Sequence, residues 1–255
     1  MSNRVINGSM AGKLFILALL VIAIIASSIS ALNVKGTPSN WALASVKRAN
    51  DINIIPEHIE LGYKNRITRE EFSEISLKLY EAITGKSAVL QGQNPFVDTK
   101  NTSIQKAYNL GLVKGRGNGV FAPYDMISRQ EISVILYRAL KAAKPYYNYT
   151  FNYQYIFEDD YAIASWARGA VGYLYGIEVI NGVGYNMFDP KRNTSKEEAI
   201  VLAQRIYDKI QLSPDNLVVS RSGTNRRTAV LRSKLAELLP LEMGKPYQWG
   251  GIGPN

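Results

Sequence analysis

The chain has 255 residues, of which 46% are hydrophobic and 20% charged, and this composition predicts a folded, globular body. It contains no cysteine and a single histidine, His58, which excludes disulfides, thiolate metal sites, cysteine nucleophiles and multi-histidine sites but leaves carboxylate chemistry open. The net charge of +9 predicts attraction to a polyanion such as nucleic acid, an anionic membrane surface or an acidic wall polymer.

Residues 1–31 have the pattern of a secretory signal peptide. Arg4 and Lys13 precede an apolar run over residues 14–25, and small residues follow at 26–31. The apolar stretch continues weakly to Leu32 and approaches the roughly 20 residues that a membrane span needs, so an uncleaved anchor is the alternative. Serines in its second half favour the cleaved signal. Both interpretations predict export, a membrane contact only through an uncleaved segment, and no nucleic acid as partner.

One six-residue phrase occurs three times, at residues 67–72, 127–132 and 194–199. Each copy has a hydroxyl residue, then a cation, and a glutamate three places after the hydroxyl. Repetition at about sixty residues indicates repeated units that share a core. Each unit reads as a helix, a turn, a short apolar segment and a second helix that begins at the phrase. We therefore expect a mainly α fold with little or no sheet, and repeats at 38–90, 91–145 and 155–212.

Two connecting segments differ from the repeats. Residues 144–155 are rich in aromatic side chains without helical spacing and predict an irregular strap. Its rings either cover apolar surface or stack on sugars, since aromatic faces are amphipathic. Residues 213–228 are polar, contain three arginines and predict a basic linker.

The outer residues of the phrase predict a helix cap. A Ser or Thr followed three residues later by Glu forms a capping box, in which each side chain bonds the backbone N–H of the other. The three candidate pairs are Thr68 with Glu71, Ser128 with Glu131, and Ser195 with Glu198.

The cation inside the phrase is harder to explain as a cap. Arg69, Arg129 and Lys196 are expected at the first helical position, where the helix dipole disfavours a positive charge. A helix start also presents free N–H groups that favour a carboxylate or phosphate, so three cations there suggest a bound anion. An ion pair between repeats is the alternative.

These features resemble the S-layer homology repeats of bacterial cell-surface proteins. The matching features are Trp41 and Trp166, the turn at 111–115, Phe121 with Pro123, Phe188 with Pro190, and the three phrases, which together span residues 38 to 210. The resemblance implies three repeats in a pseudo-threefold bundle. It also implies grooves between repeats that bind a secondary cell wall polymer, often through its pyruvate ketal carboxylate, or a peptidoglycan-linked glycan.

The resemblance further implies polymer-binding residues at positions that match the family's motif. These are the basic Arg69, Arg129 and Lys196, the tryptophans Trp41 and Trp166, the turn glycines Gly115 and Gly182, and the acidic Asp98 and Asp159 at repeat starts. The first copy lacks the glycine, the second lacks the tryptophan and the third has lysine in place of arginine. We therefore expect unequal grooves, with the one that uses Arg129 the most family-like in its turn and phrase. No catalytic residue, metal or cofactor is expected.

Residues 229–255 resemble the opening of an NlpC-type papain-like peptidoglycan endopeptidase. The similarity rests on a helix followed by Gly244, Pro246, Trp249 and a glycine-rich end, and that family's nucleophilic cysteine would follow beyond Asn255. A glycine-rich tail is the alternative. The resemblance to S-layer homology repeats thus implies non-covalent anchoring at the bacterial cell wall or S-layer surface. An anchored endopeptidase and a protein-binding helical scaffold are the other hypotheses.

Overall fold

A computed structural model describes residues 36–151 and 156–212 of the chain. The expected signal segment (1–31), the basic linker (213–228) and the expected hydrolase start (229–255) lie outside these residues and stay predictions. No helix within the two described ranges is long and apolar enough to cross a membrane.

The described residues form helices and no strand. The α-helices are α2 (Leu43–Asp51), α3 (Arg69–Thr84), α4 (Thr102–Asn109), α5 (Arg129–Ala143), α6 (Ser165–Gly176) and α7 (Lys196–Leu212), and the short 3-10 helices are η1 (Glu57–Glu60), η2 (Asp160–Ala162) and η3 (Gly184–Asn186). Extended pairing within the described ranges is limited to isolated bridges. The prediction of a mainly α fold is confirmed.

The second helix of each repeat begins at the repeated phrase. At α3 the backbone N–H of Thr68 donates to the Glu71 carboxylate (2.9 Å), and the Glu71 N–H donates to the Thr68 hydroxyl (3.2 Å). Ser195 and Glu198 make the same reciprocal pair at α7, at 2.8 and 3.3 Å. The corresponding residues at α5 also bond each other. The expected caps are therefore present, and they fix where these helices start.

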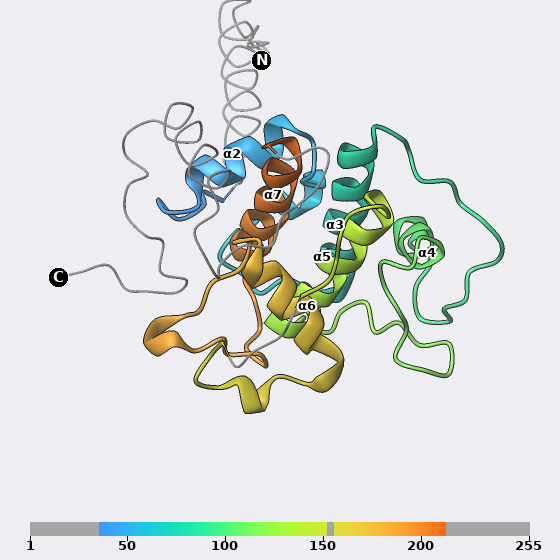
Figure 1. The fold of residues 1–255 in the computed structure, drawn as a ribbon. Helices are drawn as coiled ribbons and strands as arrows, with labels where there is room; N and C mark the ends of the chain where they lie inside the picture. The colour runs from blue at the N-terminus through green and yellow to red at the C-terminus, as the bar shows by residue number, and fades with distance from the viewer. Residues whose placement is uncertain (1–35, 152–155, 213–255) are drawn as a thin grey trace, which may run out of the picture.

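The helices interlock around a centre formed by α3, α5 and α7, which contact one another (Figure 1). Each first helix packs against the second helix of the preceding repeat: α4 on α3, α6 on α5, and α2 on α7. The last of these contacts joins the first repeat to the third. Ser39 strengthens this closure, because its N–H and its hydroxyl each donate to the Glu197 carboxylate at 2.8 Å.

Three backbone hydrogen bonds mark a threefold centre. The N–H of Ile67 donates to the carbonyl of Thr194 (2.9 Å), that of Thr194 to Ile127 (3.2 Å), and that of Ile127 to Ile67 (3.2 Å). The three residues precede the phrase hydroxyl in their own repeats, and all three are fully buried. Such a closed cycle of equivalent bonds is what a pseudo-threefold bundle of three repeats requires.

Replacing Thr194 with valine is expected to raise the free energy of unfolding by about 1 kcal/mol, because a buried polar atom without a partner is costly. The Oγ1 atom of Thr194 is buried and has no hydrogen-bond partner among the described residues, whereas the equivalent positions are isoleucine. Valine has nearly the same shape without the hydroxyl. Denaturant unfolding would measure the change, and a clear loss of stability would show that the hydroxyl has a partner in solution.

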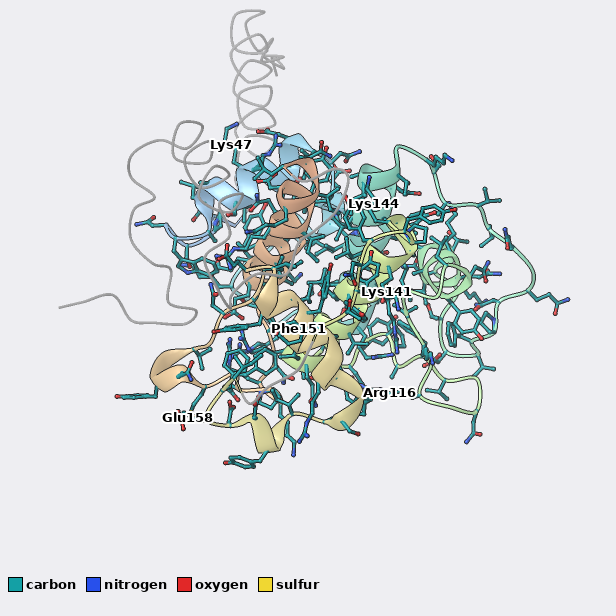
Figure 2. The ribbon with its side chains drawn as sticks, viewed as in Figure 1. Lys47, Arg116, Lys141, Lys144, Phe151 and Glu158 are labelled. Carbon is teal, nitrogen blue, oxygen red and sulfur yellow. The ribbon has the colours of Figure 1, made fainter. Side chains whose placement is uncertain are left out.

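The aromatic strap covers helices in its described part. The rings of Tyr147 and Tyr149 turn inward, and Tyr149 lies 5.2 Å from the ring of Tyr173 and donates its hydroxyl to the carbonyl of Lys144 (2.7 Å). Burial raises the pKa of the Tyr149 hydroxyl. Figure 2 labels Lys144 and Phe151, the first and last residues of the described part of the strap. Tyr146, by contrast, is 99% exposed. The inward rings therefore cover apolar surface, which is the first of the two interpretations of the strap.

Candidate functional site

The Arg69 side chain crosses from the first repeat into the second. Its Nε donates to the carbonyl of Phe121 (3.1 Å) and its Nη2 to the carbonyl of Lys114 (3.1 Å). Its third nitrogen lies 3.5 Å from the Glu131 carboxylate, and its guanidinium carbon lies 4.9 Å from the centre of the Phe121 ring. The residue is 6% exposed. Arg69 therefore holds the turn and the apolar segment of the second repeat against the first.

The other two phrase cations make the same kind of contact one repeat further on. Arg129, 3% exposed, donates to the carbonyls of Phe188 (2.7 Å) and Asn181 (3.1 Å) and lies 4.8 Å from the Phe188 ring centre. Lys196 donates to the carbonyl of Leu61 and pairs with the Glu71 carboxylate at 2.6 Å. The expected alternative of an ion pair between repeats is therefore present at Lys196 and, more loosely, at Arg69.

The N–H groups at these helix starts also bond the next repeat. The N–H groups of Arg69 and Glu70 donate to the carbonyls of Asp125 (2.9 Å) and Pro123 (3.0 Å). Equivalent bonds join residues 129 and 130 to 192 and 190, and residues 196 and 197 to 65 and 63. These N–H groups were expected to be free for an anion, but the carbonyls of another repeat bond them. The helix dipole disfavours a cation at these positions, but hydrogen bonds from the cationic side chains to carbonyls of the neighbouring repeat offset this cost.

Asp98 and Asp159 organise the segments that Arg69 and Arg129 contact. Both carboxylate oxygens of Asp98 accept backbone N–H groups, from Phe121 (2.8 Å) and Ala122 (2.7 Å). Asp159 accepts the equivalent N–H groups of residues 188 and 189 at 2.6 and 2.7 Å. Burial opposes ionisation of Asp98, but the two N–H donors outweigh it and lower the pKa of the carboxyl. Both aspartates thus hold the apolar segment of their own repeat in place. A polymer contact by either residue stays a prediction.

Gly115 and Gly182 permit close approach of two segments. A Cβ atom on Gly115 would lie 2.8 Å from the carbonyl oxygen of Val120 and 2.9 Å from a ring carbon of Phe96. A Cβ atom on Gly182 would lie 3.0 Å from the carbonyl oxygen of Met187. Glycine is therefore needed for packing at residue 115, and a side chain at residue 182 would be tightly crowded. A polymer contact by either glycine stays a prediction.

The two tryptophans are partly exposed near the starts of the first helices. Trp166 is the second residue of α6 and is 58% exposed, and Trp41 precedes α2 and is 41% exposed. Large aromatic side chains with one face open can cover a sugar ring. Trp166 lies in a groove together with predicted cationic residues.

One open groove lies where the three repeats meet around Arg69, and we call it the Arg69 groove. It has a volume of about 160 Å³ and is lined by Arg69, Lys114, Gly115, Arg116, Glu131, Val134, Ile135, Arg138 and Trp166. In Figure 2 the labelled Arg116 side chain lies near the start of α6, the helix that carries Trp166. Four lining residues are cations and one is a carboxylate, so the groove presents net positive charge beside an exposed indole.

The surroundings of Arg129 are closed. A small space lined by Arg129, Ser133, Ile180, Asn181, Phe188 and Leu202 has no room for a water molecule. The two phrase arginines each reach the turn of the following repeat. Arg69 thus meets Gly115, and Arg129 meets the Gly182 turn.

The groove adds residues that the sequence analysis missed. Arg69, Gly115 and Trp166 were predicted, while Lys114, Arg116, Glu131 and Arg138 were not. The last two share one face of α5 with Val134, at the helical spacing of 131, 134 and 138. The sequence alone shows that these three residues share a helix face, but it does not show that this face lines a groove, because that depends on how α5 packs.

The charges in the groove are coupled. Burial lowers the pKa of the Arg69 guanidinium, and the nearby Arg116 lowers it further. Burial opposes ionisation of Glu131, but Ser128, Arg116 and Arg69 outweigh it and lower the pKa of its carboxyl. Arg116 contacts the Glu131 carboxylate at 2.8 Å. Within the described ranges, no group of acidic or histidine side chains could hold a metal ion.

Known proteins are similar to parts of this chain. Residues 97–132 and 156–200 match the S-layer homology domain. The chain is 28% identical over 177 residues to an amylopullulanase of Thermoanaerobacterium thermosulfurigenes and 28% identical over 177 residues to the exoglucanase XynX of Acetivibrio thermocellus. Both matches cover 67% of this chain, but 9% and 16% of the relatives.

A third relative is an endoglucanase of Bacillus sp. (strain KSM-635), 32% identical over 125 residues that cover 46% of this chain and 12% of the enzyme. The chain thus matches only a small share of the length of these curated relatives. The segments matched to the domain contain Asp98 and the Arg129 phrase in the second repeat, and Trp166 and the Lys196 phrase in the third. Two segments of the chain thus match the S-layer homology domain, and these matches together indicate an exported protein located at the bacterial cell wall or S-layer surface.

Proposed function

We propose that this protein anchors itself non-covalently to the bacterial cell wall by binding an anionic secondary cell wall polymer in the Arg69 groove. The observation that carries the proposal is the gathering of four cations and an exposed tryptophan around one open volume of about 160 Å³. The match to the S-layer homology domain supports it, because that domain indicates a cell-wall glycan as the class of partner.

The chemistry of the groove fits a charged sugar. A guanidinium binds a carboxylate through two parallel hydrogen bonds, and an indole face covers the apolar face of a sugar ring. The pyruvate ketal carboxylate implied by the family resemblance has both parts, a planar anion on a sugar. We propose that this is the group the groove binds.

The remaining predicted binding residues have other positions in this proposal. Trp41 and Lys196 lie where the third repeat meets the first, Arg129, Asp159 and Gly182 where the second meets the third, and Asp98 behind the Arg69 groove. Lys196 is paired with Glu71 at 2.6 Å, and the space at Arg129 is closed. We therefore expect the Arg69 groove to make the strongest polymer contact.

Retention on purified cell-wall sacculi tests the proposal. The unmodified protein should sediment with sacculi, and the variant Trp166→Ala should be retained about tenfold more weakly, because the sugar loses its stacking surface. The double variant Lys47→Ala/Lys86→Ala is the matched control, since both lysines are exposed and absent from the groove. Equal retention of all three proteins, or none by the unmodified protein, would contradict the proposal.

We also propose that residues 229–255 begin an NlpC-type endopeptidase domain, so that the repeats would hold a peptidoglycan hydrolase at its substrate. The support is the sequence pattern alone, since these residues lie outside the described structure. Reading the gene past the codon for Asn255 tests this idea. A cysteine codon within a few positions, with a histidine codon downstream, is expected, and its absence would remove the idea.

A further inference from the structure

The guanidinium of Arg69 is already occupied by the protein. Its three nitrogens contact two backbone carbonyls and a carboxylate, and its face lies on the Phe121 ring. Arg129 makes the matching carbonyl and ring contacts in a place with no room for a ligand. We call these contacts of Arg69 and Arg129 the clamp between the repeats. They form without a ligand, so joining the repeats is a sufficient role for both arginines.

Arg138 is different from Arg69 in every one of these respects. It lies on α5 about two turns beyond Glu131, lines the Arg69 groove and is half-buried. Burial lowers the pKa of its guanidinium. It makes no hydrogen bond, ion pair or ring contact within residues 36–151 and 156–212. A partly desolvated cation without a counterion is costly, so its position at an open groove favours an anion from outside the chain.

Of the other two groove cations, Arg116 is paired within the protein and Lys114 is not. Arg116 is engaged by the Glu131 carboxylate at 2.8 Å. The backbone carbonyl of Lys114 accepts from Arg69, but its exposed ammonium has no ion pair or hydrogen bond in the described part of the chain. The charges open to a ligand are therefore those of Arg138 and Lys114.

We propose that Arg138 is the residue that binds the anionic group of the ligand, with Lys114 as a second charge, and that Arg69 is a positioning residue that builds the groove. This inference rests on the proposed function, because it assigns the specificity of the same groove. The ligand it describes is a sugar that carries a planar or tetrahedral anion, either a carboxylate or a phosphate, and that presents one ring face to Trp166.

Binding of solubilised wall polymer to folded variants tests the assignment. Arg138→Ala should bind about tenfold or more weakly with an unchanged or higher melting temperature, because it removes an uncompensated charge. Arg138→Lys should bind with intermediate affinity, since it keeps the charge and loses the fork. Arg69→Lys should lower the melting temperature and leave the affinity of the folded protein nearly unchanged. Full affinity of Arg138→Ala together with loss in Arg69→Lys would overturn the inference.

A second measurement separates this inference from the proposed function. The Nε–H signal of Arg138 is followed by nuclear magnetic resonance during titration with glucuronate and, separately, with glucose 6-phosphate. We expect this signal to shift while that of Arg69 stays in place, and the stronger of the two probes identifies the kind of anion. A shift without binding to sacculi would reject wall anchoring and keep the anion site. No shift with either probe would overturn the site.

Discussion

Replacing Arg129 with alanine is expected to lower the free energy of unfolding by about 3 kcal/mol or more. The change leaves the carbonyls of Phe188 and Asn181 without their charged donor at a buried junction between the second and third repeats. It also removes the guanidinium that lies on the Phe188 ring.

Denaturant unfolding at neutral pH measures this effect. Arg129→Lys should recover part of the loss, because an ammonium reaches one carbonyl but cannot span two. Arg138→Ala, which removes the same side chain nine positions further along α5, serves as the matched control and should cost little stability. A loss in Arg129→Ala no larger than in this control would show that the clamp between the repeats contributes little.

Replacing Phe121 with alanine is expected to lower the free energy of unfolding by about 3 to 5 kcal/mol. Phe121 is fully buried, and its ring lies 5.1 Å from that of Phe96 and 4.9 Å from the Arg69 guanidinium carbon. The cavity left behind adjoins the wall of the Arg69 groove. Retention on sacculi should therefore fall with stability, because Arg69 and the turn at Gly115 lose their support.

Thermal unfolding and sacculus retention should be measured together for this variant. Phe121→Leu fills most of the volume and should lose less than half as much stability. Tyr146→Ala removes an aromatic ring that is almost wholly exposed and should change neither quantity. Normal retention by a Phe121→Ala protein that is clearly less stable would show that the groove does not depend on this wall.

The sequence predicted those parts of the fold that short-range chemistry determines. The starts of α3, α5 and α7 follow from a hydroxyl and a glutamate three residues apart, because both partners of the cap lie in one segment. The repeat period also predicted three similar units. No single copy contains the partner of its cation. Arg69 is the first residue of α3, but its side chain bonds the carbonyls of Phe121 and Lys114 in the next repeat.

The candidate site was only partly predictable for the same reason. Gly115 and Trp166 could be recognised because they occupy motif positions, whereas Arg138 occupies none. Its proposed role depends on which face of α5 meets α6 and on its having no charge partner among the described residues, and both are properties of the packed molecule. The prediction of free N–H donors at the helix starts failed because the carbonyls of another repeat bond them.

The contact of α2 with α7 has a consequence for how the body gains its stability. An open row of helical repeats has two ends, and an end unit can fray while the others stay folded. Here Ser39 and Glu197, 158 positions apart, join the first unit to the last, so every unit has two neighbours. Losing any one unit uncovers apolar faces on both others. We therefore expect the three units to unfold together in one cooperative step, and we expect slow folding, because the chain must bring distant segments together before their contacts can form.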